Sequence, residues 1–198
     1  MTTHTVRKIL TESLPILAVV LVFALAAGQF LDQTVNGLRV IFPLILLMVP
    51  AFIDITGDLA GVLGARVTSH LYTGELDQGF RPYRLLFANL MAILLVSASA
   101  YAFLGVCVIL ISVGLAPLIG VIFPAWGFVH LFFAILGAGV LATACTSLIG
   151  LFAAQLVYKF GRDPDSVIPP LTTTVGDLLG IIFIALAIIA TGRLLGII

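Results

Sequence analysis

The chain has 198 residues, of which 62% are hydrophobic and 9% charged, and its formal net charge is zero. Soluble domains have roughly 45–50% apolar and about 25% charged residues, so this composition excludes an ordinary soluble protein and predicts an integral membrane protein. The neutral balance also excludes the basic footprint of a nucleic-acid-binding domain. We therefore expect the lipid bilayer of a cell membrane as its surroundings, and no nucleic-acid partner.

Long apolar runs predict an all-α, polytopic protein with five transmembrane helices in one domain over residues 1–198, since about 20 apolar residues span a bilayer as a helix. Basic residues precede the first run, and Ala24-Leu25-Ala26 resembles a cleavage site. A secretory signal is therefore the alternative to a retained first helix. The five predicted helices cover residues 14–30, 38–72, 85–113, 126–158 and 171–195.

Polar or uncharged segments separate these runs. Residues 32–37 (DQTVNG) predict a tight turn because Asn-Gly is a turn signal. Residues 74–84 (GELDQGFRPYR) predict a charged loop, and residues 159–170 (KFGRDPDSVIPP) a loop rich in charge and proline. Residues 114–124 carry no charge and two prolines, which favours a loop or a re-entrant turn.

The basic residues predict the orientation. Most of them fall on the side of the amino terminus, and positive residues accumulate on the cytoplasmic side of membrane proteins. We therefore expect a cytoplasmic amino terminus and, after five spans, a carboxyl terminus outside. The residues expected inside are Arg7, Lys8, Arg81, Arg84, Lys159 and Arg162, and those expected outside are Arg39 and Arg193.

Two copies of one motif place acidic residues inside the apolar runs. Gly57-Asp58-Leu59-Ala60-Gly61 is echoed by Gly176-Asp177-Leu178-Leu179-Gly180, and Asp54 lies one turn before Asp58. A charge within hydrocarbon costs about 2.5–3.5 kcal/mol even on the insertion scale, so these aspartates need a functional explanation. We interpret both segments as the walls of a cation path.

Depth and facing support this interpretation. At about 1.5 Å per residue, the predicted helices bring all three carboxylates into the inner third of the membrane or to its edge. Residues three or four apart share one helical face. The predicted stripe of the second helix is Asp54, Asp58, Gly61, Ala65 and Thr68, and that of the fifth is Thr173, Asp177 and Gly180.

The residue types indicate the ion. Hard oxygen ligands without His or Cys suit Mg²⁺, Mn²⁺ or Ca²⁺, and a sparse acidic layer suits Mg²⁺ that retains water. A proton would also relieve the repulsion between carboxylates, so proton coupling stays open. The spacing of the glycines, Gly57-x-x-x-Gly61 and Gly176-x-x-x-Gly180, is also typical of helix-packing motifs. Arg66 either neutralises Asp58 in an empty site or anchors the second helix at the inner headgroups.

These motifs resemble the MgtE-type magnesium transporters and their vertebrate solute-carrier relatives. The signature of the family's second helix is similar to three segments of this sequence: Pro50, Gly57-Asp58-Leu59 and Ala65-Arg66. A more specific string leads into the fifth helix: Asp163-Pro164, then Pro169 or Pro170, Thr172-Thr173-Thr174 and Asp177.

The resemblance implies that Asp177 binds Mg²⁺ in the pore with help from Thr173, and that helices 2 and 5 of two protomers enclose one pore in a homodimer. Asp58 departs from the family, which usually has asparagine there. The family's cytosolic and CBS sensor domains have no counterpart in the sequence, so we expect gating by the membrane unit, a partner or a coupling ion. The expected metal ligands are Asp177, Asp58, Asp54 and Thr173, and the expected pore-lining residues are Gly57, Gly61, Gly176, Gly180 and Arg66.

A membrane-embedded enzyme of the CDP-alcohol phosphatidyltransferase type is the main alternative. The order of residues in the motif of these enzymes is matched by Asp54, Asp58, Gly61, Ala65 and Arg66. The second Asp-Gly pair that the enzyme motif requires is absent from this sequence. An intramembrane aspartyl protease would also use two Gly-Asp sites, but the tyrosine and proline signatures that accompany them are missing from this sequence. The layer of acidic residues argues against a purely structural membrane subunit. The sequence therefore predicts a divalent cation transporter rather than an enzyme.

Overall fold

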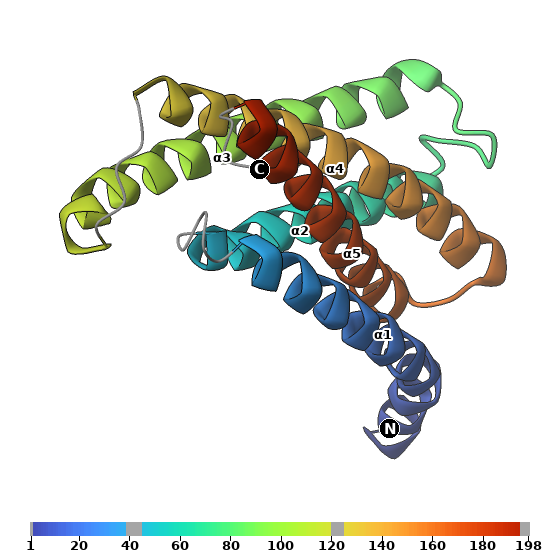
Figure 1. Cartoon of the computed structure of the whole chain (residues 1–198). Helices are drawn as coiled ribbons and strands as arrows, with labels where there is room; N and C mark the ends of the chain where they lie inside the picture. Colours follow the sequence, from blue (N-terminus) through green and yellow to red (C-terminus); the bar gives the residue numbers. More distant parts are fainter. Residues whose placement is uncertain (1, 39–44, 120–124, 195–198) are drawn as a thin grey trace.

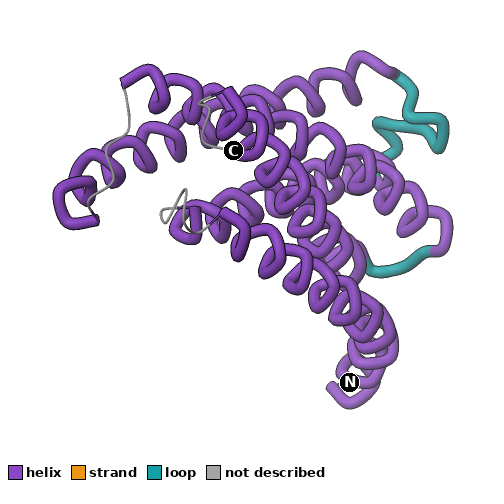
Figure 2. Tube along the Cα trace, viewed as in Figure 1, coloured by secondary structure: helices purple, strands orange, loops and turns teal. Residues whose placement is uncertain are grey.

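The structure is a computed structural model that describes residues 2–38, 45–119 and 125–194. Within these ranges the chain forms five helices and no strand, as Figure 1 and Figure 2 show, which confirms the all-α prediction. The helices are α1 (Thr2–Leu38), α2 (Ile45–Tyr72), α3 (Tyr83–Ile119), α4 (Ala125–Phe160) and α5 (Pro164–Leu194).

Four of these helices are long and apolar enough to cross a membrane. Their candidate spans are Met48–Tyr72, Tyr83–Gly114, Gly127–Phe160 and Pro164–Ala190. In the described part of α1 the apolar stretch is shorter, Leu17–Phe30. The protein is therefore a multi-pass membrane protein with four candidate spans, and a fifth span through α1 stays a prediction.

The turn predicted at residues 32–37 is wrong, because α1 continues as a helix to Leu38. Asp32 and Gln33 lie exposed on that helix, so their polarity does not require a turn. The predicted start of the second helix at residue 38 is wrong for the same reason. Residues 39–44 lie outside the described ranges, and α2 begins at Ile45.

The proline-rich loop predicted at residues 159–170 is also wrong over most of its length. Only residues 161–163 separate α4 from α5. Pro164 is the first residue of α5, a position where its missing N–H and fixed φ are favourable. Pro169 and Pro170 lie within the helix near this end. The uncharged loop predicted at residues 114–124 is helical as far as Ile119, and residues 120–124 lie outside the described ranges.

Helices α2, α4 and α5 pack against one another and form the centre of the bundle. The outer helices are α3, which packs against α2 and α4, and α1, which lies along α5 (Figure 1). The largest core cluster joins four helices around Phe52, Tyr101, Ile135 and Ile184. A second cluster around Leu63 lies further along α2. The glycine-aspartate motif of α2 lies between the two clusters.

Candidate cation path between α2 and α5

The two glycine-aspartate motifs lie in direct backbone contact. A Cβ atom on Gly176 would be 2.5 Å from the Cα atom of Gly57, and one on Gly57 would be 2.8 Å from the Cα atom of Thr173. Real Cβ atoms do not approach other atoms so closely, so any larger residue here would force α2 and α5 apart. Glycine is required at both positions by this crossing, as in other close helix contacts within membranes.

The contact continues along both helices in antiparallel order. Gly61 faces the Oγ1 atom of Thr172, and a Cβ on Gly180 would lie 3.2 Å from the Cα atom of Ile53. A Cβ on Gly64 would meet the side chain of Ile168 at 2.7 Å. Small residues therefore keep α2 and α5 close over several turns, which fixes the relative height of the residues that follow each glycine.

The three aspartates lie on the two helices that form this contact. Asp58 follows Gly57 and Asp177 follows Gly176, so the crossing holds these two residues at the same level of the bundle. Asp54 and Asp58 lie exposed on α2, whereas Asp177 is half-buried on α5. The Asp177 carboxylate is close enough to those of Asp54 and Asp58 for their charges to interact. The structure thus brings together acidic residues that lie far apart in the sequence.

Asp58 and Asp177 lie near the middle of their helices. Asp58 is about 20 Å along α2 from Ile45, and Asp177 is about 20 Å along α5 from Pro164, at 1.5 Å per residue. Asp177 lies further from the start of its helix than predicted, because α5 begins seven residues earlier. The depth of the carboxylates in the membrane stays a prediction.

One predicted stripe is only partly correct. Asp54, Asp58 and Ala65 lie on the exposed face of α2, together with Val62. Thr68 is buried instead, and its hydroxyl donates to the Gly64 carbonyl at 2.8 Å. The open face is therefore rotated away from Thr68, since the neighbouring helices cover that side of α2.

Thr173 belongs to a row of threonines that bond back along α5. Its hydroxyl donates to the Pro169 carbonyl at 2.8 Å, with the Pro170 carbonyl at 3.2 Å. Thr172 and Thr174 make similar bonds, and both are buried. A donating hydroxyl oxygen keeps its lone pairs, so Thr173 retains the capacity to accept a hydrogen bond from a water or to face a cation.

Arg66 lies exposed on α2, eight residues after Asp58. Eight residues correspond to about 12 Å along a helix. Among the described residues, Arg66 forms no ion pair with Asp54 or Asp58. Near this end of α2, His70 forms a side-chain hydrogen bond with Glu75 instead. The two roles that the sequence suggested for Arg66 both stay open.

The aspartates do not form a closed metal cage within one protomer. Over residues 2–38, 45–119 and 125–194, no group of three or more His, Cys, Asp or Glu side chains is close enough together to hold an ion. Mg²⁺ keeps several waters and commonly binds through one or two carboxylates. The carboxylates around the helix crossing are therefore suited to contact a hydrated ion through water rather than to strip it.

Sequence reasoning missed the residues that hold α2 from its other side. The Tyr101 hydroxyl lies 2.6 Å from Thr56 Oγ1 and 3.4 Å from Thr143 Oγ1, and thus joins α2, α3 and α4. A Cβ on Gly139 would lie 2.3 Å from the Tyr101 ring. Gly150 packs closely against the Ala60 carbonyl. Glycines within apolar helices were the available signal, but only those flanking aspartates were singled out.

A comparison with protein families identifies one match. Residues 49–187 match the family model of MgtE, described as a divalent cation transporter. The match runs from α2 into α5 and contains the crossing and all three aspartates, while α1 lies outside it. A comparison with curated proteins finds no match.

Proposed function

The chain belongs to the MgtE family of divalent cation transporters, and we propose that it carries hydrated Mg²⁺ across the cell membrane along a path lined by α2 and α5. Transport of divalent cations follows from the family. Because this is a transporter family, the phosphatidyltransferase alternative is not supported. The preference for Mg²⁺, the lining residues and the oligomeric state are the parts that we propose.

The backbone contact between Gly57 and Gly176 is the observation that carries the proposal. It sets Asp58 and Asp177 at one height and leaves the carboxylates on the accessible edge of the crossing. Asp177 is the proposed central ligand, with Asp54, Asp58 and Thr173 as further oxygen donors. Gly57, Gly61, Gly176 and Gly180 contribute by allowing the close approach, and Arg66 lines one end of the path.

The choice of Mg²⁺ follows from the donors and their separation. Carboxylate and hydroxyl oxygens favour Mg²⁺, Ca²⁺ and Mn²⁺ over softer metals. Among these ions Mg²⁺ gives up its waters most reluctantly, so a loose set of carboxylates suits it better than it suits Ca²⁺, which takes six to eight direct oxygen ligands. Mn²⁺ and Ca²⁺ are therefore expected as weaker competitors.

The exposed face of α2 supports a homodimer. Asp54, Asp58 and Arg66 are exposed in one protomer although α2 is a candidate membrane span. Charged side chains in membrane proteins face a bundle interior or water rather than lipid. A second copy facing this side would enclose the stripe, and the path would then lie between two protomers.

The amino terminus is proposed to be cytoplasmic.

Flux into proteoliposomes tests the proposed ligand. Purified protein is reconstituted around a Mg²⁺-sensitive dye, and external Mg²⁺ is added with or without Mn²⁺ or Ca²⁺. We expect Asp177→Asn to lose most of the flux and Asp165→Asn to keep it, since Asp165 is an exposed carboxylate in the first turn of the same helix. Equal flux in the Asp177→Asn variant and the unmodified protein would show that the path lies elsewhere.

A further inference from the structure

Two consecutive prolines, Pro169 and Pro170, lie in the second turn of α5. A helical carbonyl accepts from the N–H four residues later, or three residues later in a tighter turn, and proline has no N–H. For the Ser166 carbonyl both of these positions are proline, so it has no helical donor at either one. The Asp165 carbonyl differs, because Ile168 has an N–H three residues later. The two prolines therefore single out one main-chain oxygen.

The side chains around this oxygen bond elsewhere. The hydroxyls of residues 172–174 donate to the carbonyls of residues 168–170. The hydroxyl of Ser166 itself donates to the Asp163 carboxylate at 3.3 Å. In the described part of the chain, no side chain donates to the Ser166 carbonyl. Since α5 is a candidate membrane span from Pro164 onward, leaving this carbonyl without a partner is costly unless water or a polar ligand reaches it.

The Ser166 carbonyl lies on the face of α5 that carries Asp177. Ser166, Pro170, Thr173 and Asp177 follow i, i+4, i+7 and i+11 spacing, and all four are partly exposed. A helical carbonyl is directed along the axis toward the residue four positions later, so that of Ser166 is directed toward Pro170 on this same face. Ser166 and Asp177 are about 16 Å apart along the helix. The oxygen therefore lies about three turns before the proposed ion ligand.

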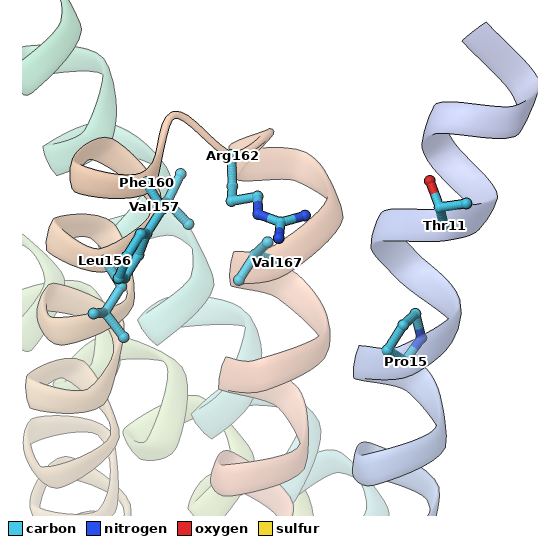
Figure 3. A pocket seen from close by; sticks show the side chains of 7 residues that line it. All are labelled: Thr11, Pro15, Leu156, Val157, Phe160, Arg162 and Val167. Carbon is cyan, nitrogen blue, oxygen red and sulfur yellow. The ribbon is translucent and has the colours of Figure 1, made fainter. Parts of the chain in front are cut away.

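A carboxylate is held beside this turn. The two oxygens of Asp163 accept from the Ser166 hydroxyl and from a backbone N–H in the first turn of α5. The neighbouring cation, Arg162, lies in the wall of a cavity beside α1 together with Val167, as Figure 3 shows. Val167 follows Ser166 and is about 100° further round the helix, so this cavity lies on another face. The nearest fixed charge on the Ser166 side is therefore negative.

The basic residue of α2 at this end is directed to a different side. Gly64 packs against the Ile168 side chain and thus faces α5. Arg66 is two residues later and about 200° further round α2. Its charge is therefore on the side of α2 that does not pack against α5.

We propose that the Ser166 carbonyl is an entry site of the cation path, at which a hydrated divalent cation binds through one of its own waters before it reaches Asp177. This inference rests on the proposed function. Mg²⁺ retains several waters in its protein sites, and these waters donate hydrogen bonds to oxygen atoms. In other transporters, carbonyls released by a broken helix coordinate cations within the membrane. The Asp163 carboxylate adds attraction at the same turn.

Pro170→Ala tests the entry site, because alanine supplies the missing N–H to the Ser166 carbonyl without a change in charge. Flux into proteoliposomes is measured against Mg²⁺ concentration. We expect the apparent Mg²⁺ affinity to fall about fivefold, the effect of one lost hydrogen bond, with the maximal flux unchanged. Pro169→Ala is the matched control. It supplies an N–H to the Asp165 carbonyl, which shares the face of Thr172 and Gly176 that packs on α2, so the affinity should stay the same.

Both variants regain a helical hydrogen bond, so we expect thermal unfolding midpoints no lower than that of the unmodified protein. The inference is overturned if Pro170→Ala keeps the normal affinity, or if Pro169→Ala lowers it equally. A lower maximal flux at normal affinity would also overturn it, because the prolines would then act as a hinge.

Asp177→Asn, measured in parallel, separates this inference from the proposed function. Loss of flux in Asp177→Asn with normal affinity in Pro170→Ala would refute the entry site and leave the proposed path standing. Normal flux in Asp177→Asn would overturn both.

Discussion

The hydroxyl oxygen of Tyr101 lies 2.6 Å from the Oγ1 atom of Thr56, the residue immediately before Gly57. Both hydroxyls also lie within hydrogen-bond distance of the Phe52 carbonyl, Thr56 at 2.9 Å and Tyr101 at 3.3 Å, so either hydroxyl can donate to the other while its partner donates to this carbonyl. The interaction is buried and ties α3 to the side of α2 that faces away from Asp54 and Asp58. Tyr101 therefore contacts α2 on the side away from the aspartates, while Gly176 of α5 contacts it at the crossing.

Loss of the Tyr101 hydroxyl is expected to weaken the bundle. Tyr101→Phe keeps the ring but removes the hydroxyl that bonds to Thr56, so we expect the free energy of unfolding to fall by about 1 kcal/mol. In a protein of this size the thermal midpoint should fall by about 2–4 °C. Thermal unfolding in detergent measures this effect. Tyr83→Phe, in which an exposed tyrosine is changed, should leave the midpoint unchanged.

Two glycines in α4 provide a matched pair. Gly139→Ala should destabilise the protein by about 1–3 kcal/mol, since its Cβ would overlap the Tyr101 ring and force it to move. Gly137→Ala, two residues earlier, meets no atom within 4 Å among the described residues and gains helix propensity. It should be neutral or stabilising. Equal unfolding midpoints for the two variants would contradict the packing of Tyr101 on α4.

The crossing itself can be tested at Gly176. Gly176→Ala places a Cβ 2.5 Å from the Gly57 backbone, which cannot yield as a flexible side chain can. We expect α2 and α5 to separate, with strongly reduced Mg²⁺ flux in proteoliposomes and a lower unfolding midpoint. The control is Gly114→Ala on α3, where a Cβ would meet no atom of the described part of the chain within 4 Å. Normal flux in Gly176→Ala protein would mean that the close crossing is not needed for transport.

Asp58→Asn should have a smaller effect than Asp177→Asn. An amide oxygen can still face the waters of a hydrated ion, and Asn occupies nearly the same volume as Asp. We expect transport to persist with an apparent Mg²⁺ affinity lowered by about fivefold, corresponding to about 1 kcal/mol for one water-separated charge. Flux measured against Mg²⁺ concentration gives this value. Complete loss of transport would assign Asp58 the role proposed for Asp177.

The proposed dimer predicts a specific cross-link. In a background of Cys107→Ser and Cys145→Ser, Ala65→Cys lies on the exposed face of α2, and oxidation should give a covalent dimer. Leu95→Cys is the control, since Leu95 is 70% exposed on α3 and is expected to face lipid. A dimer band from Leu95→Cys alone would place the contact between protomers on the other side of the bundle.

The sequence was sufficient to predict the five helices, because their apolar runs are long and the fold is entirely helical. The helix ends were less predictable. Polar and proline-rich residues at 32–37 and 164–170 are helical in the structure, since exposed polar side chains and prolines near a helix start are compatible with a helix. Local turn signals are weak when a helix continues into solvent.

The sequence predicted the parts of the candidate site that carry a charge within an apolar run or belong to the repeated Gly-Asp-Leu motif. The echo between Gly57 and Gly176 suggested that the two motifs are related, and the structure brings them into contact. The parts that depend on tertiary packing were not predictable. Nothing in the sequence distinguishes Tyr101 from other aromatic residues, or Gly139 from Gly137, because only the arrangement of α3 on α4 makes them different.

The contact between Gly57 and Gly176 also has a consequence for synthesis of the protein. The two glycines are 119 residues apart (176 − 57), so at about 5–20 residues per second the ribosome needs roughly 6–24 s to make the second after the first. For most of that interval α2 is fully synthesised, with its glycine face unoccupied and Asp58 without Asp177 nearby. The packing of α2 in the bundle can therefore be completed only after α5 has been made. We expect nascent chains arrested before Gly176 to be sensitive to quality-control proteases.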